Sequence, residues 1–97
     1  MSQVRDADPD TKIGLEALQV VIDLHAGHLE QAIAAAEGII AMEPAGDYLL
    51  HSITEALSKI GREIYRMRSN GTQIDTALAT TLAAIESRLE TLQRLRT

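Results

Sequence analysis

The chain has 97 residues, enough for one domain, and its apolar residues include no Phe, no Trp and only two Tyr. Enclosed small-molecule pockets are usually lined partly by aromatic side chains, so this composition argues against such a pocket. No Cys is present, which excludes disulfides, thiolate catalysis and thiolate metal sites. The net charge of −5 disfavours nucleic-acid binding, which depends on Lys and Arg side chains that neutralise phosphates.

The first helix is predicted over residues 9–42. Residues 1–8 carry few apolar groups, so we expect a disordered leader followed by a single helical domain over residues 9–97. Asp8 offers an N-cap and Pro9 suits the first helical position. Apolar residues then recur in steps of three and four, the pattern of an amphipathic helix. This seam comprises Leu15, Leu18, Ile22, His25, Leu29, Ala32, Ala36 and Ile39.

Two further helices follow the Glu43-Pro44-Ala45-Gly46 stretch, which ends the first one. Residues 47–69 form the second predicted helix, and Ser69-Asn70-Gly71 closes it. Thr72 and Asp75 provide a capping motif for the third, over residues 73–96. The seams of these helices consist of Leu50, Ile53, Leu57, Ile60, Ile64 and Met67, then Leu78, Leu82, Ile85, Leu89 and Leu92.

These elements predict an all-α fold, either a three-helix up-down-up bundle or a helical hairpin with a third helix. A first helix of about 50 Å would extend well beyond partners of about 35 Å and leave its apolar N-terminal half uncovered. Either the helix breaks near Gly27 and folds over, or a second copy covers it, and we favour a homodimer. The predicted interface consists of Ile13, Leu15, Leu18, Val21 and Ile22, with Glu16 and Asp23 at its edge.

The distribution of charge along the chain predicts how the helices lie relative to one another. Residues 1–57 carry two basic and ten acidic side chains, a net charge of −8, whereas residues 58–97 carry seven basic and four acidic ones, a net charge of +3. The two parts should attract each other. Antiparallel folding about residue 45 places Asp23 near Arg66, so an ion pair is expected there.

His28 resembles the phosphorylated histidine of histidine phosphotransfer domains, which are helical bundles with a His-x-x-Lys-Gly motif on a helix. Here Gln31 stands in place of the lysine, with Ala32 as the small residue and Gly38 further on. Phosphotransfer through His28 is therefore one alternative function, although the cation that steadies a phosphoryl group is missing. A His/carboxylate metal site in the bundle is the other alternative, with His25, His28 and His51 as its histidines.

Residues 27–44 are similar to the second helix of a tetratricopeptide repeat, including the small Ala32 and the closing Pro44. The preceding helix lacks the repeat pattern, and no match recurs 34 residues later apart from Gly61, so no repeat array is expected. This resemblance favours peptide or helix binding.

The sequence as a whole predicts a non-catalytic helical protein–protein interaction module, such as an adaptor, a small chaperone or a regulator. No glycine-rich phosphate loop or nucleophile elbow is present, so an enzyme is not expected. The expected partners are proteins, including a second copy, and neither nucleic acid nor membrane. We expect no cofactor and no resident metal. The absence of a signal-length apolar stretch predicts a cytoplasmic location.

Overall fold

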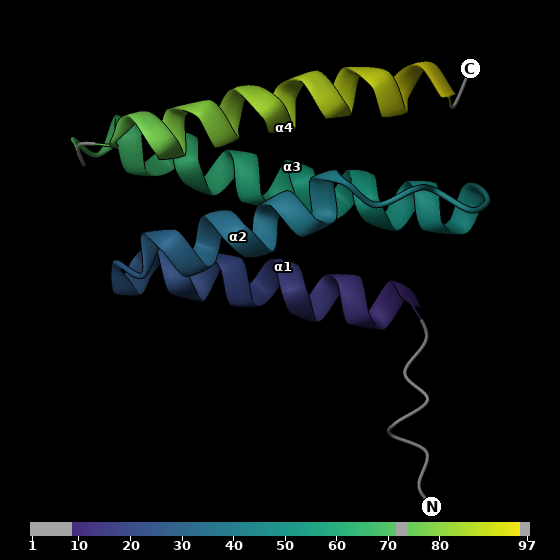
Figure 1. Ribbon diagram of the computed structural model, residues 1–97, viewed down its shortest axis with the longest axis horizontal. Coiled ribbons are helices and arrows are strands. Elements are labelled where there is room, and N and C mark those ends of the chain that lie inside the picture. Colours follow the sequence, from purple (N-terminus) through teal and green to yellow (C-terminus); the bar gives the residue numbers. More distant parts are fainter. Residues whose placement is uncertain (1–8, 72–73, 96–97) are drawn as a thin grey trace, which may run out of the picture.

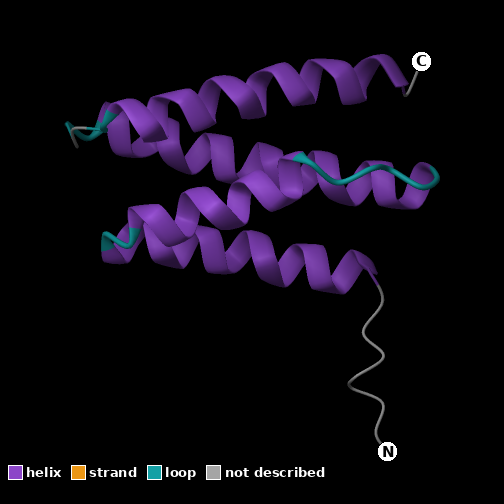
Figure 2. Ribbon diagram, viewed as in Figure 1, coloured by secondary structure: helices purple, strands orange, loops and turns teal. Residues whose placement is uncertain are grey.

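The computed structural model describes residues 9–71 and 74–95, and this part of the chain is all-α, as the sequence predicts. It forms four helices: α1 (Pro9–Ala26), α2 (Leu29–Ile40), α3 (Asp47–Ser69) and α4 (Thr76–Leu95). They are joined by short turns and one loop, with no strand among the described residues (Figure 2). The predicted leader over residues 1–8 lies outside the described residues.

The expected first helix over residues 9–42 is two helices, so the three-helix prediction is wrong at this point. Gly27, with φ of 84°, occupies the left-handed region where a side chain is disfavoured. The His28 N–H donates to the Asp23 carbonyl at 2.8 Å, and the Gly27 N–H donates to the Leu24 carbonyl at 3.3 Å. These two bonds form a Schellman motif, which ends α1 and reverses the chain into α2.

Because of this reversal, the four helices alternate in direction and lie side by side (Figure 1). The helices α1 and α4 each pack on α2 and α3, while α1 and α4 are not in contact within the described part of the chain. Figure 1 shows α1 at one edge of the molecule and α4 at the opposite edge. Each edge helix therefore has one covered side and one side that no helix of this chain covers.

The core is aliphatic and lies between all four helices. Its members on α3 and α4 are those that the stepping of apolar residues predicts, with Met67 and Leu89 at the margin. Small residues such as Ala32 and Ala36 on α2 let the helices approach closely. The buried apolar side chains are Ile13, Ala17, Val20, Leu24, Ala32, Ala36, Ile39, Leu50, Ile53, Ala56, Leu57, Ile60, Ile64, Leu78, Leu82, Ile85 and Leu92.

Side chains from outside each helix satisfy several helix ends. Asp75 Oδ1 accepts the backbone N–H of Leu78 at 2.8 Å and caps α4, which begins three residues later than the sequence predicts. Arg88 of α4 donates from Nη2 to the Met42 carbonyl at 2.8 Å, just beyond the end of α2. This bond connects the loop between α2 and α3 to α4.

Candidate functional site

The helix α1 carries apolar side chains on two opposite sides. Its inner row, Ile13, Ala17, Val20 and Leu24, is buried against α2 and α3. A second row, Leu15, Leu18 and Ile22, is exposed by 59%, 47% and 48%. At about 100° per residue the two rows lie roughly on opposite sides of the helix, so the second row points away from the molecule. We call Leu15, Leu18 and Ile22 the outer stripe.

The outer stripe is a concentration of apolar surface that the rest of the described chain does not repeat. Tyr48 and Tyr65 are exposed near opposite ends of α3, and Leu95 is exposed in the last turn of α4. Single exposed apolar residues are ordinary on protein surfaces, whereas a contiguous row on one helix face is a candidate for an interaction site. The outer stripe is therefore the strongest candidate for such a site.

The structure divides the seven residues of the predicted interface between surface and core. Ile13 is 1% exposed and Asp23 is 9% exposed, so neither is available to a partner on the surface of this chain. Val21 and Glu16 are half-buried. The sequence predicts that the N-terminal half of a long first helix is not covered by the other helices. The structure has no such uncovered half, because the reversal at Gly27 lays α1 along α3 and buries its inner row. The outer stripe alone stays exposed.

Polar anchors fix the C-terminal half of α1 against the molecule. The carboxylate of Glu63 is buried on α3, with Oε2 lying 2.6 Å from His25 Nε2 and Oε1 lying 3.1 Å from Arg66 Nη2. Asp23 accepts a hydrogen bond from Gln19 Nε2 at 3.1 Å. The expected pair between Asp23 and Arg66 is replaced by these contacts, because α1 and α3 run in the same direction rather than antiparallel.

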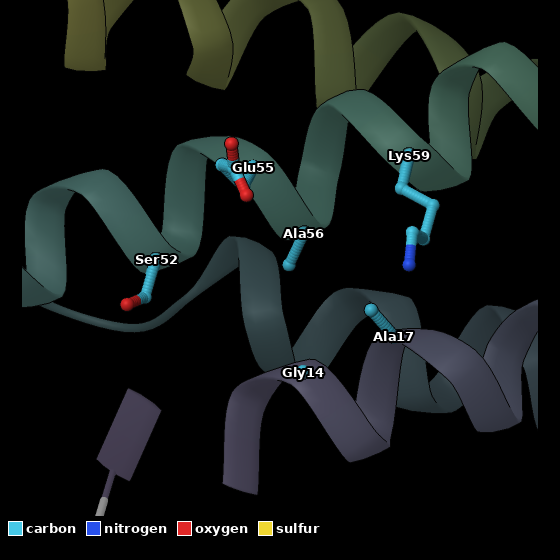
Figure 3. A pocket seen from close by; sticks show the side chains of 6 residues that line it. All are labelled: Gly14, Ala17, Ser52, Glu55, Ala56 and Lys59. Carbon is cyan, nitrogen blue, oxygen red and sulfur yellow. The ribbon is translucent and has the colours of Figure 1, made fainter. Parts of the chain in front are cut away.

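Small residues line part of the surface between α1 and α3. Gly14 and Ala17 of α1 face Ser52 and Ala56 of α3 across a shallow depression (Figure 3), with Glu55 and Lys59 at its rim. The Ser52 hydroxyl donates to the Tyr48 carbonyl at 3.1 Å within its own helix. The depression thus combines small packing residues with two surface charges, and its one hydroxyl bonds to the backbone.

His28 does not lie on a helix, contrary to what the phosphotransfer resemblance implies. It lies in the turn between α1 and α2, at the N-cap position of α2. Its Nδ1 is 3.8 Å from the carboxylate oxygen Oδ1 of Asp23. A carboxylate at this distance would repel a phosphoryl group, so the surroundings of His28 add no support for phosphotransfer.

The three histidines lie at separate places on the surface. His25 contacts Glu63, His28 lies near Asp23, and His51 lies 3.7 Å from Glu55 on the exposed side of α3. Over residues 9–71 and 74–95, no group of three or more metal-binding side chains comes together. The geometry of the described chain therefore gives the metal alternative no site.

Tyr65 and Glu86 connect α3 to α4 on the surface. The Tyr65 hydroxyl donates to Glu86 Oε2. This hydrogen bond to a carboxylate raises the pKa of Tyr65 above its ordinary value of 10.0, with smaller contributions from desolvation and from the negative charge of Glu86. Both groups are exposed, and the pair joins two helices rather than forming a reactive site.

No family model matches the chain, and comparisons with curated proteins and with solved structures give no match. None of the helices in the described part of the chain is long and apolar enough to cross a membrane.

The sequence predicts Leu15, Leu18 and Ile22 both as the start of the seam that continues to Ile39 and as part of the partner interface. The structure leaves these three side chains exposed instead of placing them in the core. The signal for the true arrangement was the second apolar row in the same helix, Ile13, Ala17, Val20 and Leu24, which follows the same steps of three and four. A helix with two such rows needs cover on both sides.

Proposed function

We propose that this chain is a non-catalytic helical interaction module, an adaptor, small chaperone or regulator, that binds an amphipathic helix of a partner protein on the outer stripe. Self-association through the same stripe belongs to this proposal. The observation that carries it is the exposure of Leu15, Leu18 and Ile22 in a row opposite the buried side of α1.

The outer stripe leaves apolar surface in contact with water, and a partner that covers it gains free energy of binding. Complete burial of a Leu or Ile side chain is worth about 1.5–3 kcal/mol, so covering the exposed half of three such side chains contributes roughly 2–4 kcal/mol. A partner helix with its own apolar row at steps of three and four fits this shape, as in other helix-docking complexes. The anchors at His25 and Glu63 hold α1 in place, so the surface is formed before binding.

The experiment compares two double variants of the full chain. Leu18→Glu with Ile22→Glu places two carboxylates in the outer stripe. Thr80→Glu with Ala84→Glu is the matched control, because both positions are exposed, have the same spacing and lie on α4 at the opposite edge. Circular dichroism verifies that both variants are folded. Proteins captured by the wild-type chain from an extract of its source cells are then purified and titrated against all three forms.

The expected result is a partner whose Kd is the same for the wild-type chain and the α4 control, and at least about 30-fold weaker for the outer-stripe variant, since loss of a hot spot costs about 2 kcal/mol or more. If every captured protein binds the outer-stripe variant as tightly as the wild-type chain, and self-association is also unchanged, the proposed function is wrong.

A further inference from the structure

We infer that a second copy of this chain occupies the outer stripe in the free protein, with the two α1 helices antiparallel about a two-fold axis beside Leu18. The inference rests on the proposed function, because it names the occupant of the same surface. Two properties of α1 support it, the spacing of its exposed apolar residues and the placement of its charges, and its length limits the strength of the dimer.

The spacing of the outer stripe makes it complementary to itself. Leu15 lies three residues before Leu18, and Ile22 lies four residues after it. A two-fold axis beside Leu18 therefore brings Leu15 of one copy level with Ile22 of the other, while the two Leu18 side chains meet near the axis. This antiparallel placement overlaps the two stripes along their full length, and two-fold pairing of one surface with itself is the commonest form of assembly.

The charges of α1 favour the antiparallel over the parallel arrangement. Lys12 lies beside the N-terminal end of the outer stripe, whereas Glu16 is half-buried and Asp23 is buried. Antiparallel pairing places Lys12 of one copy near the C-terminal end of α1 in the other copy, where the helix dipole is negative. Parallel pairing would instead place the two Lys12 ammonium groups next to each other and align the two dipoles.

The length of α1 limits how strong this dimer can be. A helix of 18 residues is about 27 Å long and about 10 Å wide, so it covers roughly 270 Å² of projected surface on each copy. A standard stable interface buries about 800 Å² on each partner. The dimer is therefore expected to be weak and to exchange with the monomer.

This weak dimer has a regulatory consequence. The second copy covers the same three side chains that a partner helix needs, so self-association and partner binding exclude each other. The monomer is the form that binds, and a partner of higher affinity displaces the second copy. High concentration of free chain then competes with its own partner.

The absence of Cys from the sequence allows the arrangement to be tested with single cysteine substitutions. Leu15→Cys and Ile22→Cys chains are incubated separately and as a mixture in a glutathione redox buffer. In the antiparallel dimer the two positions are level with each other, but two copies of the same position are separated by about 10 Å along the axis. Disulfides require Cα atoms about 4.4–6.8 Å apart.

The expected result is a mixed disulfide at least about 10-fold more abundant than either symmetric one. Ala84→Cys, at an exposed position of α4, should give only the small amount of disulfide that forms by random collision. Symmetric disulfides that exceed the mixed one would show parallel pairing and would overturn the inference. If the mixed disulfide and both symmetric disulfides form in equal amounts, no greater than for Ala84→Cys, the inference is also overturned.

Sedimentation equilibrium without cysteines provides the independent measurement. The wild-type chain and the Thr80→Glu, Ala84→Glu control should associate with the same dissociation constant, and Leu18→Glu, Ile22→Glu should stay monomeric. Loss of association in the α4 control, or a wild-type chain that is monomeric up to about 1 mM, would refute the dimer. If the wild-type chain is monomeric but partner capture still depends on the outer stripe, this inference and the self-association part of the proposed function fail, while the binding of a partner helix stands.

Discussion

Replacement of Gly27 by Ala tests the reversal that separates α1 from α2. A Cβ built at Gly27 meets no other atom within 4 Å, so the substitution introduces no clash. Its effect must come from the backbone, because Gly27 has φ of 84°, where an L-residue costs about 1–2 kcal/mol. Ala also restricts the unfolded chain, which offsets about 0.4–1 kcal/mol of that cost. The expected net loss is roughly 1 kcal/mol.

Gly38→Ala is the matched control for this prediction. Gly38 also has open space around the position of its Cβ, but it lies within α2 and does not have a positive φ. Ala in the interior of a helix is more stable than Gly by about 0.5–1 kcal/mol. The same chemical change should therefore destabilise the protein at residue 27 and stabilise it at residue 38.

Urea denaturation followed by circular dichroism at one chain concentration measures both variants. The two free energies of unfolding should differ by roughly 2 kcal/mol, and the midpoints of thermal unfolding by roughly 8–16 °C, since 1 kcal/mol corresponds to about 4–8 °C in a domain of this size. If Gly27→Ala stabilises the protein as much as Gly38→Ala does, a continuous helix over residues 9–42 is the better description, and the four-helix arrangement is wrong.

Two further predictions concern contacts of α4. Arg88→Met should lower the free energy of unfolding by about 1–3 kcal/mol in urea denaturation, because the Met42 carbonyl loses the bond from Arg88 Nη2; an unchanged value would show that solvent satisfies this carbonyl equally well. Glu86→Gln should lower the pKa of Tyr65 toward 10.0 in an ultraviolet titration, since the carboxylate raises that pKa by accepting a hydrogen bond from the protonated phenol. A raised pKa in the folded state contributes stability below the unfolded value that is lost as the pH rises through the folded value, so the variant should lack this loss at alkaline pH.

The fold was predictable from the sequence where caps and apolar spacing agreed. The second predicted helix has the same bounds as α3, and the third differs from α4 by three residues at its start and one at its end. Its start is later because Asp75 is the cap of α4. Pro44 and Gly46 separated α2 from α3 correctly, since proline and glycine have strong and local conformational effects.

A break near Gly27 is one of the two alternatives that the sequence offers, but the sequence does not decide for it, because the steps of three and four continue through Gly27. Leu29, Ala32 and Ala36 extend the spacing that begins at Leu15, so periodicity alone supports one long helix. A single Gly in a helical pattern is tolerated at a cost of about 1 kcal/mol. Tertiary packing decides between the alternatives, since folding back at Gly27 buries the inner row of α1.

The same ambiguity explains why the candidate site was only partly predictable. A helix with two apolar rows does not indicate which row faces its own domain. The row with larger side chains, Leu15, Leu18 and Ile22, was the more obvious seam, yet the structure buries the row that includes the small Ala17. Ala17 faces Ala56 of α3 across a shallow depression (Figure 3). A domain without large aromatic side chains gains contact by close approach, which favours the smaller row inside.

This choice connects the composition of the chain to its surface. A core of Leu, Ile, Val and Ala packs well only where helices approach closely. The inner side of α1 contributes Ile13 and Leu24 to this core together with the smaller Ala17 and Val20, whereas Leu15, Leu18 and Ile22 stay exposed on the outer side. A domain of this size buries only about 60–65% of the surface that its unfolded chain exposes. The apolar area that stays exposed on an edge helix is therefore a substantial share of the apolar area whose burial could stabilise the domain. If a partner covers the outer stripe as proposed, binding adds stabilisation to the folded chain, and the stability of the domain then depends on the concentration of that partner.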